Sequence, residues 1–156
     1  MISLKSKQQG FTIVELLIVI VVIGILAGLV LVTFNGIQQK ARNTERQTDL
    51  KAIQSHLEAY NAQNGRYPLL SDMNTQPGTG NWWIQTNMKG LDKEALRDPK
   101  NSTHSLANAA TVNQYAYAPT ADDGSACDNT ATDCGKYTLT SKLEGGAADY
   151  VLNSLN

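Results

Sequence analysis

A single carboxylate, Glu15, stands in an otherwise apolar stretch near the start of this 156-residue chain. The stretch "FTIVELLIVIVVIGILAGLVLVTF" runs from Phe11 to Phe34, and its only other polar side chains are Thr12 and Thr33. A carboxylate within a membrane helix costs ~2.5–3.5 kcal/mol on insertion scales, so it persists where a partner neutralises it. The position of Glu15 therefore predicts a functional partner of opposite charge.

The chain contains two cysteines, Cys127 and Cys134, within the polar segment "CDNTATDC". If this segment lies outside the cytoplasm, its spacing favours a disulfide that closes a short loop. Two free thiols are the alternative. A zinc site would need further ligands, and the histidines His56 and His104 do not have the spacing of zinc ligands.

Acidic residues gather around the two cysteines, namely Asp122, Asp123, Asp128 and Asp133. Calcium binds six to eight oxygen atoms, so these carboxylates are weak calcium candidates. They do not have the spacing of an EF-hand loop. A solvated acidic loop is therefore the favoured interpretation, and we expect no bound metal.

Motifs that indicate catalysis are not found in the sequence. The chain has no glycine-rich phosphate loop and no G-x-S-x-G motif, and Asp98, His104 and Ser105 form a triad only if they are placed arbitrarily. The net charge of -1 leaves no excess of Lys and Arg to neutralise phosphates. We therefore expect no enzyme, no cofactor and no direct binding of nucleic acid.

The element that would position the early carboxylate follows from the length of the apolar stretch. As a helix, residues 11–34 would span ~36 Å at ~1.5 Å per residue, which is enough to cross a hydrocarbon core of ~30 Å. Lys5 and Lys7 ahead of the stretch predict a cytoplasmic N-terminus, although Lys40 and Arg42 on its far side count against that orientation.

Helical spacing continues beyond the apolar stretch, over residues 35–64. Apolar positions within Leu50–Tyr60 form a stripe that can pack on a sheet. The segment "NGRYP" then predicts the end of the helix, with Gly65 in the left-handed conformation. Two pairs of opposite charge have the i, i+3 spacing of weak helix-supporting contacts: Arg42–Glu45 and Arg46–Asp49.

Residues 65–156 predict a small head of mixed structure. Residues 69–90 are predicted to form a loop, and a short helix is expected from its cap at Asp92 to its stop at Pro99. Strand signals come later, at Gln114–Ala118, Lys136–Leu143 and Asp149–Asn153. The predicted fold class is α+β, in which a long N-terminal helix packs on a small antiparallel β-sheet.

The beginning of the chain resembles the type IV pilins and the related pseudopilins of type II secretion. The resemblance is carried by a short basic leader ending in Gly10, then Phe11, Glu15 and the unbroken apolar run in "GFTIVELLIVIVVIGILAGL". It implies that a prepilin peptidase in the membrane cuts after Gly10 and methylates the new N-terminus at Phe11. It also implies four segments in a pilin fold: a cleaved leader (1–10), a transmembrane and filament-core half-helix (11–34), an amphipathic half-helix (35–64) and a globular head (65–156).

The same resemblance makes Glu15 the assembly residue. We expect its carboxylate to pair with the new amine of Phe11 in a neighbouring subunit, because any other offset between the two helices would leave a charge buried without a partner. The implied partners are other copies of the chain in a helical filament, the prepilin peptidase and the assembly machinery in the membrane.

Three functions follow, in order of expectation. The first is a structural subunit of a type IV pilus-like surface filament, of the kind used in adhesion or motility. Before assembly this subunit is a single-pass protein of the cytoplasmic membrane with its N-terminus inside. The alternative is a pseudopilin of a type II secretion system, whose short filament pushes substrates outward. The third is an uncleaved membrane-anchored binding module.

Overall fold

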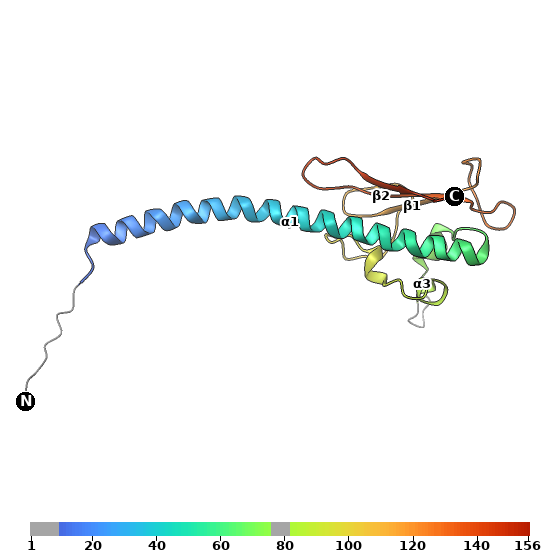
Figure 1. Cartoon of the computed structure of the whole chain (residues 1–156), viewed down its shortest axis with the longest axis horizontal. Helices are drawn as coiled ribbons and strands as arrows, with labels where there is room; N and C mark the ends of the chain where they lie inside the picture. The colour runs from blue at the N-terminus through green and yellow to red at the C-terminus, as the bar shows by residue number, and fades with distance from the viewer. Residues whose placement is uncertain (1–9, 76–81) are drawn as a thin grey trace, which may run out of the picture. The chain divides into compact units, whose positions relative to one another are not determined.

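The computed structural model describes residues 10–75 and 82–156 (Figure 1). Most of the predicted leader, with Lys5 and Lys7, lies outside the described residues. The main element is helix α1, Ile13–Asn64, of 52 residues. The chain divides into two compact units, residues 1–38 and 39–156, and α1 contributes to both. We describe each unit by itself.

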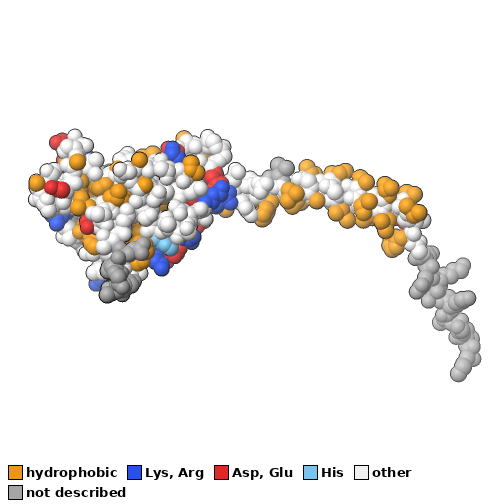
Figure 2. All heavy atoms as spheres, turned by 180° about the vertical axis from the view of Figure 1, so that it is seen from behind, with side chains coloured by type: hydrophobic (Ala, Val, Ile, Leu, Met, Phe, Trp, Pro, Cys, Tyr) orange, Lys and Arg blue, Asp and Glu red, His pale blue; other side chains and the backbone are white. Residues whose placement is uncertain are grey.

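The first unit exposes its apolar side chains. Residues 10–31 and 33–38 are all exposed, and α1 is long and apolar enough to cross a membrane. Figure 2 shows apolar side chains along this part of the helix. A helix whose apolar surface is left uncovered requires lipid or other helices around it. This part of α1 is therefore suited to a membrane or to a bundle of other apolar helices.

The second unit has the predicted α+β fold. Strands β1 (Ala116–Thr120), β2 (Lys136–Ser141) and β3 (Tyr150–Asn153) form an antiparallel sheet in the order β1-β2-β3. Its register pairs Tyr117 with Leu139 and Leu139 with Leu152. Figure 1 shows the sheet along one side of α1 and helix α3 on the other. All three strands were predicted at these places, and the fold class is confirmed.

The hydrophobic core forms between α1 and the head. Leu50, Ile53 and Leu57 of α1 are completely buried, as the apolar stripe predicted. Their 3–4 residue spacing places them on one face of the helix. Tyr67 and Tyr117 are also completely buried on the head side. The contact between helix and head is thus a continuous apolar core, which fixes the polar groups described below.

The segment predicted as loop, residues 69–90, differs from that expectation. It contains two one-turn helices, α2 (Leu70–Asn74) and α3 (Trp83–Asn87), on either side of residues 76–81, which lie outside the described residues. Helices this short are marginal by propensity alone. The buried side chains of Met73 and Ile84 hold them against the core.

Caps and turns account for the remaining boundaries. Gly65, at φ 73°, ends α1 in the left-handed conformation, where a residue with a Cβ would be strained. The predicted helix after Asp92 is a 3-10 helix, η1 (Lys93–Leu96), and the Asp92 carboxylate accepts a hydrogen bond from the Glu94 amide at 3.0 Å. The stop at Gly65 and the cap at Asp92 were both predicted from local sequence signals.

Candidate functional site

The predicted processing site lies just ahead of α1. Gly10 and Phe11 are not helical, and the Phe11 side chain is 87 % exposed. Among the described residues, no atom apart from those of Gly10 itself and its chain neighbours lies within 4 Å of the position that a Cβ on Gly10 would take. The peptide bond between Gly10 and Phe11 is therefore open to a peptidase that approaches from solvent or membrane.

Glu15 is held by Thr12 in a reciprocal capping box. The amide and the hydroxyl of Thr12 donate to Oε2 of Glu15 at 2.9 and 2.8 Å, and the Glu15 amide donates to Thr12 Oγ1 at 3.2 Å. These bonds satisfy backbone donors that the first turn of a helix leaves open. We did not predict this contact, although the spacing T-x-x-E before an apolar run is its sequence signature.

The capping box engages only one of the two carboxylate oxygens of Glu15. Within the part of the chain that the structure describes, Oε1 accepts no hydrogen bond. The hydrogen bonds from Thr12 therefore offset part of the cost of placing the carboxylate in an apolar segment, and they leave one oxygen for a group outside the subunit. This geometry fits the predicted pairing with the amine of a neighbouring Phe11.

In the head, a buried arginine joins α1 to two loops. Arg46 is completely buried and binds Asp98 through two hydrogen bonds, Nε to Oδ2 at 2.7 Å and Nη2 to Oδ1 at 3.0 Å. Its Nη1 group donates to Glu144 Oε1 at 2.8 Å. Arg42 forms a bidentate ion pair with the same carboxylate, with Nε donating to Oε1 at 2.8 Å and Nη2 donating to Oε2 at 2.7 Å. Lys100 Nζ lies 2.9 Å from Oε2 of Glu144. The hydrogen bond from Arg42 is the main reason that the pKa of Glu144 lies well below its usual value.

The predicted pairs Arg42–Glu45 and Arg46–Asp49 were therefore wrong. Both arginines reach across to head residues about 50 and 100 positions away in the sequence. A two-fold arginine–carboxylate contact is stronger than an exposed pair along one helix, which contributes only a few tenths of a kcal/mol. The head thus supplies the better partners, and the helix is locked to it.

Asp49, left without an arginine, accepts a hydrogen bond from the Tyr115 hydroxyl at 2.7 Å. Burial raises the pKa of Asp49 to about 6, while this hydrogen bond opposes the shift. A raised pKa means that the folded state favours the protonated form. The contribution of Asp49 to stability is therefore complete below its unfolded pKa of ~3.9 and is lost as the pH rises through 6.

Replacement of Asp49 by asparagine should consequently stabilise the head at pH 7.5 and have little effect at pH 4. The expected gain at pH 7.5 is about 1–3 kcal/mol, since the amide oxygen can still accept from Tyr115 and no charge is buried. Urea denaturation of the full chain in detergent at the two pH values measures it. Asp149→Asn, which removes an exposed partner of Lys142, is the control and should change stability by less than ~1 kcal/mol at either pH. Equal effects of Asp49→Asn at both pH values would contradict the assignment.

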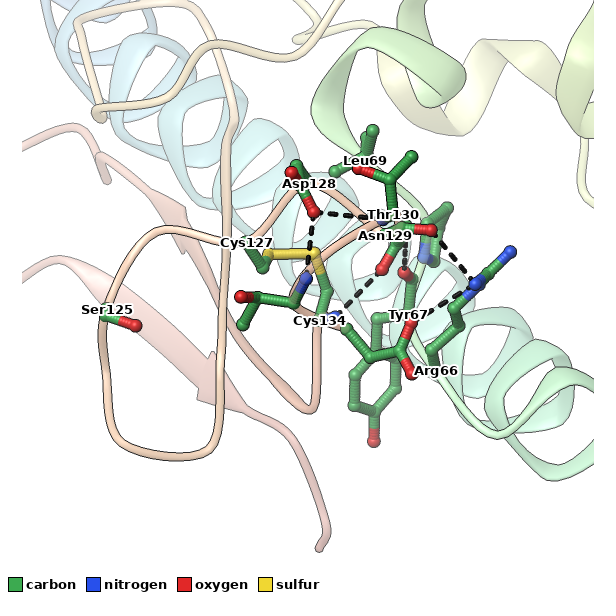
Figure 3. Close-up of a disulfide and its surroundings, with 12 residues drawn as sticks. Arg66, Tyr67, Leu69, Ser125, Cys127, Asp128, Asn129, Thr130 and Cys134 are labelled. Carbon is green, nitrogen blue, oxygen red and sulfur yellow. Dashed lines mark hydrogen bonds and ion pairs between the residues drawn. A yellow bond between two sulfur atoms is a disulfide. The ribbon is translucent and has the colours of Figure 1, made fainter.

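Cys127 and Cys134 form a disulfide, and the loop it closes is fastened to the end of α1 (Figure 3). The Asn129 side chain joins both parts, since its Nδ2 donates to the Tyr67 carbonyl at 2.8 Å and its Oδ1 accepts from the Cys134 amide at 2.8 Å. The Tyr67 amide donates to the Cys134 carbonyl at 2.7 Å. Arg66 adds contacts to the Asn129 carbonyl and to Asp133, both at 3.1 Å.

Loss of the disulfide should weaken this attachment. With a sequence separation of 7, the closed loop is short, and the chain-entropy relation gives about 2.5 kcal/mol. The double variant Cys127→Ala/Cys134→Ala is therefore expected to unfold at a lower urea concentration and to exchange the Tyr67 amide proton faster. A reducing agent should lower the stability of the natural chain but not of the double variant. Unchanged stability and exchange would show that the loop is held without the bond.

The four weak calcium candidates do not form a metal site. Oδ1 of Asp128 accepts from the amides of Thr130, Ala131 and Thr132, and these bonds lower the pKa of Asp128. Asp133 pairs with Arg66, and Asp123 accepts from an amide two residues on. In residues 10–75 and 82–156 no three His, Cys, Asp or Glu side chains lie close enough together to hold a metal ion. The acidic residues shape the turns of the loop instead.

Comparison with known proteins gave two family matches. The model of the prokaryotic N-terminal methylation motif matches residues 5–31, and the model of type II secretion system protein G matches residues 34–136. Proteins named type II secretion system core protein G are similar to the chain. The one from Klebsiella michiganensis is 30 % identical over 88 % of this chain and 99 % of its own length. The one from Dickeya chrysanthemi is 36 % identical over 74 % and 80 %. No solved structure matches the chain.

Proposed function

Because the chain belongs to the protein G family of type II secretion systems, we propose that it is a pseudopilin, the subunit of a filament that drives secretion. The observation that carries the proposal is the match to protein G over residues 34–136, which includes most of the head. The sequence alone favoured a surface pilus and ranked the pseudopilin second. The comparisons favour the second of the two, and nothing in them supports adhesion or motility.

Processing is the first step of the proposed function. A prepilin peptidase cuts the bond after Gly10, which lies outside any helix, and Phe11 becomes the methylated first residue. The cut replaces a peptide nitrogen by a charged amine at the end of the apolar segment. Such a charge is costly in lipid unless it finds a partner of opposite sign.

Assembly supplies that partner. The free Oε1 atom of Glu15 in one subunit accepts the amine of Phe11 from the next, while Thr12 keeps hold of Oε2. When Glu15 of one subunit lies beside Phe11 of the next, the two helices are shifted past each other by four residues, which is about 6 Å along the helix axis. The same offset repeated from copy to copy gives an open helical filament, because the contact does not close on itself.

The head lies on the outer side of the cytoplasmic membrane in this proposal. The disulfide supports this side, since disulfides persist in oxidising compartments. Arg42, which counted against this orientation, is paired with Glu144 in the structure, so much of its charge is offset locally. The first described unit remains in the membrane until the filament forms.

Removal of the gene tests the proposal directly. Proteins that the host exports by its type II system should then be retained by the cell, and the natural chain should restore their release. A Gly10→Val chain, which blocks the cut, should insert in the membrane but fail to restore release. Normal release combined with the loss of long surface filaments would favour the surface pilus. Full restoration by the uncut chain would favour the membrane-anchored binding module.

A further inference from the structure

The head contains a pocket that has no part in the contacts proposed for the filament core. It has a volume of about 370 Å³, within the range of ligand pockets, and lies between the last turns of α1 and the segment at and after α3. Its wall contains His56, Tyr60 and Gln63 of α1, together with Thr86, Asn87 and Lys89.

The polar groups of this pocket are poorly satisfied inside the subunit. Among the described residues, the side chains of His56, Gln63, Thr86 and Lys89 have no hydrogen-bond or ion-pair partner, and Asn87 uses only its Nδ2 group, which donates to the Trp83 carbonyl at 2.9 Å. No carboxylate lines the pocket. It therefore offers hydrogen-bond donors and the positive charge of Lys89, which suits an anionic occupant.

The same head carries an exposed acidic turn, residues 121–125, whose charge is opposite to that of Lys89 in the pocket. Asp122 and Asp123 stand at its tip and are both exposed, and Lys136 lies beside them, where its Nζ donates to the Asp122 carbonyl. The two carboxylates outnumber this one ammonium group, so the turn remains acidic. The turn is closed by hydrogen bonds of 2.9 Å from the Gly124 amide to the Ala121 carbonyl and from the Ala121 amide to the Ser125 carbonyl. The Asp123 carboxylate also accepts from the Ser125 amide at 2.9 Å, so the turn is ordered within the subunit and presenting it costs little additional ordering.

We propose that the acidic turn of one copy, Asp122–Asp123, occupies the pocket of the next copy in the filament, with Lys89 as the partner charge. This contact rests on the proposed function and adds a second, head-level contact to the one at Glu15. Its basis is the complementary charge of the turn and the pocket. Both belong to every copy, so the contact can repeat along the filament.

The pocket and the acidic turn belong to different elements of the head. The disulfide loop contacts Arg66 and Tyr67, just past the end of α1, whereas the pocket lies beside residues 56–64. Figure 1 shows the loop between β1 and β2 at this end of the head. One copy can therefore present its turn while its own pocket receives the turn of another copy.

Zero-length coupling of amines to carboxylates tests the contact in the natural chain. Filaments are assembled from a mixture of isotopically heavy and light chains, treated with a carbodiimide and digested. We expect peptides that join Lys89 of one isotope to Asp122 or Asp123 of the other. Filaments that yield links at other exposed lysines but none at Lys89 would overturn the proposal, as would links from Lys89 only within one chain or to another protein.

Charge reversal gives a second measurement that does not depend on coupling chemistry. Lys89→Glu and Asp123→Lys should each reduce filament yield at least about fivefold, because each places like charges together. The two changes in one chain restore opposite charges between copies, so the double variant should return to within about twofold of the natural yield. Lys51→Glu, an exposed reversal on α1 outside the pocket, is the matched control and should assemble normally.

The results also separate this contact from the proposed function. If the natural chain forms no filament, the pseudopilin proposal itself fails. If the natural chain assembles and both single reversals assemble equally well, the filament stands and the pocket contact is wrong. Reduced yield in both single variants without recovery in the double variant would likewise reject the pairing of these two surfaces.

Discussion

Replacement of Glu15 by alanine is expected to reduce filament assembly at least about tenfold while leaving insertion in the membrane intact. Insertion depends on the apolar stretch, which becomes more apolar by this change. In the proposed filament, assembly depends on the charge, since loss of one partner leaves the Phe11 amine of each neighbour unpaired in a medium of low dielectric. Breaking such a pair costs about 2–5 kcal/mol at each contact. The yield of filament and the amount of chain in the membrane fraction measure the two effects separately.

Glutamine at the same position separates the charge from the capping box. The amide oxygen of Glu15→Gln can still accept from Thr12, so the first turn of α1 should keep its cap. The charge is lost, and assembly should fall nearly as far as with alanine. Assembly of the glutamine variant at the natural level would mean that Glu15 serves as a helix cap and that the pairing with Phe11 is wrong.

Replacement of Arg46 by methionine is expected to lower the free energy of unfolding of the head by about 3–5 kcal/mol. The change leaves the carboxylate of Asp98, itself only 2 % exposed, buried without its partner, and burying an unpaired charge is among the costliest single changes in a protein. Glu144 keeps Arg42 and Lys100, so most of the loss arises at Asp98. Urea denaturation of the full chain in detergent, followed by tyrosine and tryptophan fluorescence, measures the change.

A matched replacement defines the contribution of burial. Arg97→Met removes an arginine that pairs with Glu94 three residues earlier, but 37 % of its side chain is exposed. That loss should be below ~1 kcal/mol, because exposed pairs gain little over water. Similar losses for the two variants would show that the contact between Arg46 and Asp98 does not hold the helix to the head.

The features that sequence analysis found depend on short-range patterns. The apolar segment, the stop at Gly65 and the alternation in β2 each lie within a few residues, and so their prediction needed no knowledge of distant contacts. The charge at Glu15 was also evident, because a carboxylate in an apolar run is unusual in itself. The capping box with Thr12 was not predicted, although the spacing T-x-x-E is an equally local signal.

The features that could not be predicted from the sequence depend on tertiary packing. Arg46 pairs with Asp98, 52 positions later, and no local spacing marks that pair. Helices α2 and α3 exist because Met73 and Ile84 are buried, which propensity does not reveal. The order of the two filament functions could not be settled from the N-terminal motif, since pilins and pseudopilins share it. The match to protein G over residues 34–136, which includes most of the head, favours the pseudopilin.

The intact mass of the chain isolated from cell membranes shows directly whether the chain is cut after Gly10, as the proposed filament requires. We expect a species that begins at Phe11, carries one added methyl group and is two hydrogens lighter for the bond between Cys127 and Cys134. This species has the free N-terminal amine that Glu15 requires as its partner. A chain that still begins at Met1 would have no such amine at Phe11, and the pairing, the offset and the proposed filament would all be contradicted.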